Sequence, residues 1–254
     1  MGSWTTQGRA PTSPAFGARG DAAVADVAWL SYGTSSWILG HLPRLEDLPA
    51  PVQARIDNQL SPDGQADLLA ARMLARHLAI RVMPGPSEPK IEQRCSECSG
   101  RSHGRPYFSN VDDWAVSWSH SHGLVAAVVS RWSIGVDIEP VGCRMGHAGR
   151  SSYLTWTRME ALVKVGAASL DDPWTWPSPR PTTPWGYPHA ELHSAGGSVP
   201  GLVMYDIDAP QLSAVISVAM RTDTGKRVFC GNGRLIDIDL ASGLLNPVPC
   251  LQST

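Results

Sequence analysis

Residues 118–139 read Trp-Ser-His-Ser-His-Gly-Leu-Val-Ala-Ala-Val-Val-Ser-Arg-Trp-Ser-Ile-Gly-Val-Asp-Ile-Glu. The apolar run 124–129, the short break at 131–133 and the second run 134–139 predict two strands joined as a hairpin. Because side chains alternate along a strand, Asp137 and Glu139 should point to the same face. Two neighbouring carboxylates on a buried strand repel each other unless a cation lies between them. Mg²⁺ is the usual cation for such oxygen ligands, and it leaves positions free for phosphate.

A third carboxylate follows downstream, in the stretch Trp-Thr-Arg-Met-Glu-Ala-Leu-Val-Lys at 156–164. Thr157 and Glu160 have the spacing of a capping box, which predicts the beginning of a helix. Glu160 and Lys164 are four residues apart and would share a helix face, beside a helix N-terminus that favours phosphate. Two interpretations of Glu160 remain open: it caps the helix and pairs with Lys164, or it completes an acidic site with the two strand carboxylates.

Together, and in this order, the motifs resemble the larger, surfactin-synthetase-activating type of 4'-phosphopantetheinyl transferase. That family has a Ser-His-Ser motif, a Gly-(Val/Ile)-Asp-(Ile/Val)-Glu strand and a Trp-(Ser/Thr)-x-Lys-Glu-(Ala/Ser)-x-x-Lys helix. Residues 68–76 are similar to a helix of the family's first half, and His103-Gly104-Arg105-Pro106 to its Gly-(Lys/Arg)-Pro element. The resemblance covers roughly residues 25–220. It implies an α+β, pseudo-twofold, two-lobed phosphopantetheinyl transferase fold, each lobe a small antiparallel sheet with a long helix.

The resemblance also implies an activity, namely transfer of the 4'-phosphopantetheine group from coenzyme A to a serine of an acyl or peptidyl carrier protein. The reaction would require Mg²⁺ and serve secondary metabolism. In such a phosphoryl transfer, positioning and charge neutralisation provide most of the catalysis. Glu160, or a water that it orients, would accept the serine proton. The residues that match the family's motifs would take the family's roles. The metal ligands would be Asp137, Glu139 and Glu160, and the catalytic groups would be Glu160, Lys164 and His120. Coenzyme A would contact Arg105, Ser119, His120 and Lys164.

Four features depart from the family pattern. Met159 replaces a lysine, Asp67 replaces an arginine of the first-half helix, and His122 replaces a glycine after Ser-His-Ser, while the segment 140–155 is shorter than usual. A second hypothesis is therefore the same fold with another task, either a pathway enzyme with acid/base chemistry by His120, His122 and the acids or a non-catalytic carrier-protein binder. A third, an unrelated α+β binding domain, treats the shared motif order as chance.

The composition is that of a globular protein, with 43% hydrophobic residues, 17% charged residues, and 23 acids against 21 bases. The net charge of -2 argues against a nucleic-acid binder. No apolar run reaches about 18 residues, so we expect no membrane span. The odd number of cysteines and the lack of a secretion signal suggest reduced thiols, and we expect a cytoplasmic monomer.

Cys95 and Cys98 form a Cys-x-x-Cys pair with His103 nearby. A structural zinc site usually has four ligands, and the other cysteines have no paired spacing that would complete it. The sequence therefore favours a loop with two unligated thiols over a zinc site.

The chain is expected to divide into a flexible N-terminus (1–22), an N-terminal lobe (23–113), a C-terminal lobe with the Mg²⁺-site motifs (114–220) and a C-terminal extension (221–254). Asn232-Gly233 predicts a hairpin in the extension, which the family resemblance does not account for. We expect Arg72 and Arg76 to share a solvated helix face. Further expectations are strands at 24–29, 36–39, 203–208 and 212–220, helices at 45–60 and after Ser61-Pro62-Asp63, and loops at 90–104 and 173–188.

Overall fold

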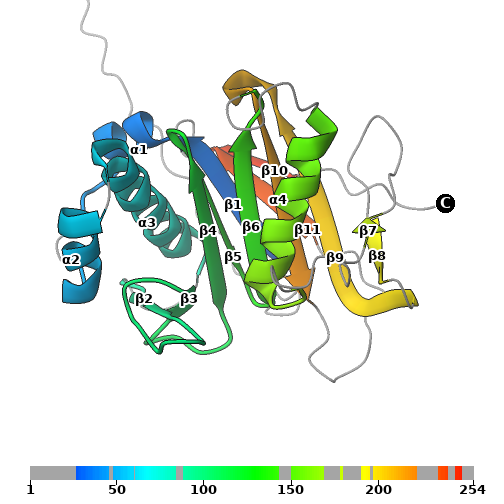
Figure 1. Ribbon diagram of the computed structural model, residues 1–254, viewed down its shortest axis with the longest axis horizontal. Coiled ribbons are helices and arrows are strands. Elements are labelled where there is room, and N and C mark those ends of the chain that lie inside the picture. Colours follow the sequence, from blue (N-terminus) through cyan, green and yellow to red (C-terminus); the bar gives the residue numbers. More distant parts are fainter. Residues whose placement is uncertain are drawn as a thin grey trace, which may run out of the picture.

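The computed structural model describes residues 27–45, 48–59, 61–83, 88–142, 150–168, 178–179, 190–194, 197–221, 234–239 and 244–247. These residues form an α+β structure with two five-stranded sheets, a two-stranded sheet and four α-helices (Figure 1). The predicted α+β class with small, mainly antiparallel sheets is therefore confirmed. Among the described helices, none combines the length and the apolar character needed to cross a membrane.

The first five-stranded sheet has the strand order β12-β11-β1-β5-β4. Its strands are β1 (Val27–Thr34), β4 (Ala115–Ser121), β5 (Leu124–Ser130), β11 (Arg234–Asp239) and β12 (Leu244–Pro247). β1 pairs antiparallel with β5 and parallel with β11, and β11 pairs antiparallel with β12. Strands near the C-terminus therefore extend the sheet that contains the first described strand. The predicted turn at Asn232-Gly233 lies outside the described residues.

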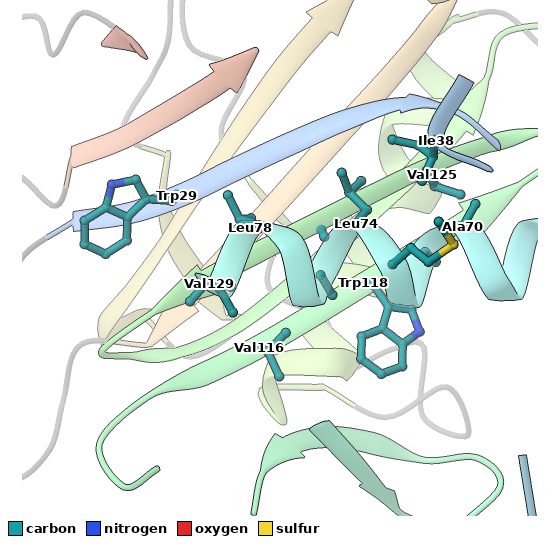
Figure 2. Packing of buried hydrophobic residues seen from close by; sticks show 14 of the residues in the cluster. Trp29, Ile38, Ala70, Leu74, Leu78, Val116, Trp118, Val125 and Val129 are labelled. Carbon is teal, nitrogen blue, oxygen red and sulfur yellow. The ribbon is translucent and has the colours of Figure 1, made fainter. Parts of the chain in front are cut away.

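Three helices precede β4: α1 (Ser35–His41), α2 (Ala50–Gln59) and α3 (Pro62–Val82). α3 begins where the sequence predicted, because the Ser61 side chain accepts a hydrogen bond from the Gly64 amide at 3.2 Å and Pro62 fits the first turn. The helix packs on β4 and β5. Leu74 and Leu78, four residues apart, lie in the same apolar cluster as Trp118, and their side chains point towards the strands (Figure 2).

The second five-stranded sheet has the order β6-β10-β9-β8-β7 and carries the fourth helix, α4 (Arg150–Val165), on β6 and β10 (Figure 1). Its strands are β6 (Ser133–Pro140), β7 (Ser178–Pro179), β8 (Ala190–Ser194), β9 (Gly197–Ala209) and β10 (Ala214–Arg221), with a 3₁₀ turn, η3 (Pro210–Leu212), between the last two. Gly135 lets α4 approach β6 closely, since a Cβ there would lie 2.2 Å from the Ala161 carbonyl oxygen.

The hairpin within residues 118–139 lies one strand earlier than predicted. β4 and β5 pair antiparallel across His122 and Gly123, whose φ angles are 49° and 80°. Two consecutive positive φ angles are typical of a type I′ hairpin turn. β5 and β6 belong to different sheets, and β6 pairs with β10 instead. The break at 131–133 therefore carries the chain from one sheet to the other rather than closing a hairpin.

Two other predictions were wrong locally. Residues 36–39 belong to α1 rather than to a strand, because the Thr34 side chain accepts a hydrogen bond from the Trp37 amide at 3.3 Å and caps a helix there. The expected loop at 90–104 contains β2 (Ile91–Arg94), which pairs with β3 (Arg105–Phe108). Predicted helix 45–60 corresponds to α2, and the strands at 203–208 and 212–220 correspond to β9 and β10. Residues 1–22 and most of 173–188 lie outside the described ranges.

Candidate functional site

β4 and β6 lie side by side where the two large sheets meet (Figure 1). The strands belong to different sheets, and serine side chains of β4 link them. Ser117 Oγ accepts from the Val136 amide at 3.2 Å, Ser119 Oγ donates to Asp137 Oδ1 at 2.6 Å, and Ser121 Oγ donates to Glu139 Oε2 at 2.7 Å. Asp137 and Glu139 thus share a face of β6, as the alternation of strand side chains predicted.

Asp137 is a buried carboxylate, with an exposed fraction of 4%. Its Oδ1 accepts hydrogen bonds from Ser119 and from Lys164, whose Nζ lies at 2.7 Å and also donates to the Val136 carbonyl at 3.0 Å. Its Oδ2 is buried and has no hydrogen-bond partner. An unpartnered oxygen on a buried carboxylate is unfavourable, and a bound cation would satisfy it. The surroundings of Asp137 therefore fit a hard divalent cation such as Mg²⁺.

The three carboxylates assigned to a metal do not form a compact group of ligands. Within the described ranges, one group of three potential ligand atoms lies within 4.8 Å of one another, and that group does not include Asp137, Glu139 or Glu160. The assignment of these three residues to Mg²⁺ therefore stays a prediction, and Asp137 is the member whose surroundings fit a cation.

The capping-box prediction for Thr157 is wrong, because α4 begins well before it, at Arg150. Thr157 lies in the helix interior, where its Oγ1 donates to the Leu154 carbonyl at 3.0 Å and lies 2.8 Å from Ser217 Oγ. Glu160 is consequently beyond the first turn, away from the partial positive charge of the helix N-terminus. Glu160 and Lys164 therefore lie four residues apart in one helix, as predicted, but the helix N-terminus that would favour phosphate is not at Glu160.

His120 lies on β4 and is partly buried, and charged groups from several elements influence its pKa. Burial lowers the pKa of His120 below its usual value, and Lys164 and Arg55 lower it further, while the carboxylates of Asp67 and Asp137 oppose them. These four charges come from α4, α2, α3 and β6. His120 is therefore the point at which charges from the helical layer and from the β6–α4 side meet.

His122 lies in the β4–β5 turn and is exposed, with its Nδ1 at 3.0 Å from Ser121 Oγ. His120 and His122 do not share a strand face, because β4 ends at Ser121 and the backbone of His122 has turned into the left-handed region. The two imidazoles are therefore not arranged as a neighbouring acid/base pair on one strand.

Asp67 is buried and both of its carboxylate oxygens have partners. Ser35 Oγ donates to Oδ1 at 2.5 Å, and the Gly123 amide donates to Oδ2 at 3.0 Å. The Ser35 amide also donates to the Gly123 carbonyl at 2.8 Å. Asp67 therefore ties the beginning of α1 and the β4–β5 turn to α3. This structural role accounts for a carboxylate where the resemblance leads one to expect arginine.

Arg72 is a functional candidate that the sequence analysis missed, because that analysis placed it on a solvated face. It is 5% exposed, lies over the Trp118 ring at 5.1 Å and donates from Nη2 to Gln93 Oε1. Its Nε is buried without a partner, and none of the ion pairs among the described residues includes it. Burial, followed by the nearby charge of Arg55, lowers the pKa of Arg72 to about 10. The helical spacing alone did not indicate this burial, because Arg72 is followed four residues later by Arg76 and the two share a helix face.

Two further basic residues flank this region. Arg105 begins β3, and its Nη1 lies 3.7 Å from the position that a Cβ on Gly166 would take, at the end of α4. Partial burial lowers the pKa of Arg105. Arg158 forms a bidentate pair with Asp206, with Nη2–Oδ2 at 2.6 Å, so its charge is used within the fold. Arg158 thus does not substitute for the lysine that Met159 replaces.

No protein-family model matches the chain, and no curated protein is significantly similar to it in sequence. A function has to be inferred from the residues at the junction of the sheets.

Proposed function

We propose that the protein is a 4'-phosphopantetheinyl transferase that uses coenzyme A and Mg²⁺ to modify a serine of an acyl or peptidyl carrier protein. The proposal identifies the β1–β5–β4 sheet with α3 and the β6–β10–β9 sheet with α4 as the two lobes of that fold. The first lobe then includes β4 and β5, which the expected division at residues 113 and 114 assigned to the C-terminal lobe. The observation that carries it is the buried Asp137, whose Oδ1 accepts from Ser119 at 2.6 Å and from Lys164 at 2.7 Å while its Oδ2 has no partner. Ser119, Asp137 and Lys164, which belong to three separate motifs, are thereby in direct contact.

The basic residues of this region suit the phosphates of coenzyme A. Arg72 has a buried Nε without a partner, and Arg55 is close enough to lower its pKa. Hydrogen bonds from cationic groups to phosphate are among the strong polar interactions, at roughly 1.5–3 kcal/mol each. We assign Arg72, Arg55 and His120 to phosphate binding, with Arg105 at the far end of α4. His120 would take up a proton as phosphate binds, because an anion counteracts the burial that lowers its pKa.

The acidic residues suit the reacting groups. Asp137 would hold Mg²⁺ through its free Oδ2, with Glu139 beside it on the same face of β6. When bound, the ion would neutralise charge on the pyrophosphate of coenzyme A. Lys164 Nζ donates to Asp137 Oδ1 at 2.7 Å and adds a positive charge at the same place. Glu160, or a water that it orients, would accept the proton as the serine oxygen attacks the β-phosphorus and 3',5'-ADP leaves.

The proposal is tested by incubating the protein with coenzyme A, Mg²⁺ and a panel of apo carrier proteins, followed by intact-mass analysis of each carrier. We expect at least one carrier to gain the mass of one phosphopantetheine group. Asp137→Asn should abolish the gain, whereas Asp57→Asn, at an exposed acid on α2, should preserve it. Unmodified carriers throughout the panel, with saturating coenzyme A and Mg²⁺, would contradict the proposal.

A non-catalytic carrier-protein binder is the second candidate, and one observation favours it. The carboxylate oxygens of Asp137, Glu139 and Glu160 are not gathered as one ligand group in the described structure. Such a binder would bind an apo carrier protein in calorimetry without changing its mass. The repurposed enzyme with His120 and His122 as its acid/base pair receives no such support, because His122 lies in the turn.

A further inference from the structure

The loop that joins β2 to β3 gathers three side chains of metal-binding type. The ligand atoms of Cys95, Cys98 and His103 all lie within 4.8 Å of one another, and Cys98 Sγ lies 3.3 Å from His103 Nε2. Neither Cys95 nor Cys98 forms a disulfide bond in this structure. The three residues come from one short segment, so the closure of the loop itself brings their side chains together.

The loop backbone supports thiolates at this position. The amides of Cys98 and Glu97 hydrogen-bond to the Cys95 sulfur and lower the pKa of that thiol. The Gly100 amide donates to Cys98 Sγ at 3.4 Å. The same turn is closed by backbone bonds, from the Cys95 amide to the Gly100 carbonyl at 2.9 Å and from the Ser99 amide to the Cys95 carbonyl at 3.1 Å. Ser99 adopts a φ of 56°, which lets the chain wrap around the sulfurs. Backbone amides of the loop thus lie against both sulfurs, and those at Cys95 favour its negatively charged form.

We propose that Cys95, Cys98 and His103 bind one Zn²⁺, with a water molecule as the fourth ligand. Zinc takes thiolate sulfur at about 2.3 Å and imidazole nitrogen at about 2.0–2.1 Å, so a tetrahedral site has S···N edges of about 3.6 Å and S···S edges of about 3.8 Å. The separations in the loop are compatible with these edges after small side-chain movements. Two thiolates and a neutral imidazole would balance the charge of the ion. The sequence lacked a fourth ligand for a structural site, and a three-ligand site with water removes that objection.

The site would act on the position of Arg105. Gly104 follows His103 directly and has a φ of 94°, and a Cβ on it would lie 2.4 Å from the Arg94 carbonyl oxygen. Arg105 then begins β3 opposite Arg94. An ion held by His103 and the two cysteines would therefore fix both ends of the loop and the strand that directs Arg105 towards the end of α4. The zinc inference stands whether or not the protein is a transferase.

The test uses the full chain, purified without chelators and with a reductant, and measures zinc by elemental analysis. We expect about one zinc per chain. Replacing the zinc by Co²⁺ should give the intense visible bands of a tetrahedral site together with a thiolate-to-cobalt charge-transfer band. The variants Cys95→Ser and Cys98→Ser should lose the metal and the charge-transfer band, while Cys230→Ser, a cysteine elsewhere in the sequence, should keep both.

Two outcomes would overturn the inference. The first is wild-type protein that contains no zinc and whose Co²⁺ spectrum shows no thiolate band. The second is metal that remains equally bound after Cys95→Ser and Cys98→Ser, since it would then lie at another site. If the wild type lacks zinc, a preparation without reductant whose mass is lower by two hydrogens, with no such difference in Cys95→Ser, would identify the pair as a disulfide instead. His103→Ala provides the remaining check, because the proposal requires it to weaken metal binding while both thiols are still present.

Discussion

Replacing Gly135 by alanine should separate α4 from β6. A Cβ at this position would lie 2.2 Å from the Ala161 carbonyl oxygen, 2.9 Å from the Val165 nitrogen and 3.0 Å from Lys164 Cβ. Contacts below 3.0 Å essentially never occur for a real Cβ, and the two nearest atoms are helix backbone, which cannot rotate away as a side chain can. Inserting a methyl group into a packed region typically costs about 1–3 kcal/mol. We expect a loss near the upper end, about 3 kcal/mol of the free energy of unfolding.

The matched control is Gly40→Ala, because an added Cβ on Gly40 in α1 meets no atom within 4 Å. Removing a glycine from a helix should leave the stability unchanged or raise it by up to about 1 kcal/mol. Urea denaturation followed by tryptophan fluorescence gives both free energies of unfolding. If Gly135→Ala stays within about 0.5 kcal/mol of the wild type, the size of a neutral surface change, the close approach of α4 to β6 is not as described. In Gly135→Ala, the displacement of α4 should also move Lys164 away from Asp137. The modification of the carrier protein should therefore fall by more than the loss of stability alone explains.

Three further changes have defined outcomes. His122→Gly should raise the free energy of unfolding by about 0.5–1 kcal/mol in urea denaturation, because a left-handed φ of 49° costs less for glycine; a loss of stability would contradict this. Because the pKa of His120 is lowered in the folded protein, the unfolded chain takes up the proton first as the pH falls. The contribution of His120 to stability is therefore fully present above about pH 6.5 and is lost as the pH falls through the lower folded pKa. His120→Gln should flatten this pH dependence of the thermal unfolding midpoint, and an unchanged slope would refute the reasoning. Arg158→Ala should lower the free energy of unfolding by about 3 kcal/mol, because it leaves the mostly buried carboxylate of Asp206 without its ion-pair partner. Arg76→Ala removes an exposed pair with Glu88 and should lower it by at most about 1 kcal/mol. Equal losses in urea denaturation would contradict this difference.

The sequence predicted the elements whose signals are local. Ser61-Pro62 marked the beginning of α3, because a side-chain cap and a proline act within a single turn. The alternation along 134–139 placed Asp137 and Glu139 on one face, because strand geometry alone determines that relation.

The elements that were predicted wrongly depend on distant partners. β5 and β6 are both apolar, and nothing in either run shows that β5 pairs with β1 and β6 with β10, more than seventy positions along the chain. The capping-box spacing at Thr157 occurs inside a helix, where Ser217 of another strand takes the hydroxyl. Arg72 looked solvated because its helical neighbours could not reveal the Trp118 ring and Gln93 that cover it.

Two side chains of opposite charge, Arg72 and Asp137, each have a buried polar atom without a hydrogen-bond partner. Burial, followed by the nearby charge of Arg55, lowers the pKa of Arg72 to about 10, so its surroundings disfavour the charged form. Asp137 keeps a buried oxygen without a partner, although Lys164 and Ser119 satisfy the other. The charge of Arg55 lowers the pKa of both Arg72 and His120, whereas the carboxylate of Asp137 raises the pKa of His120. Arg72 lies over Trp118 and Asp137 is bonded to Ser119, and these consecutive residues of β4 point to opposite faces of the strand. Under the proposed function the two groups would therefore contact different parts of the substrate complex, with the divalent cation at Asp137 and a phosphate of coenzyme A at Arg72.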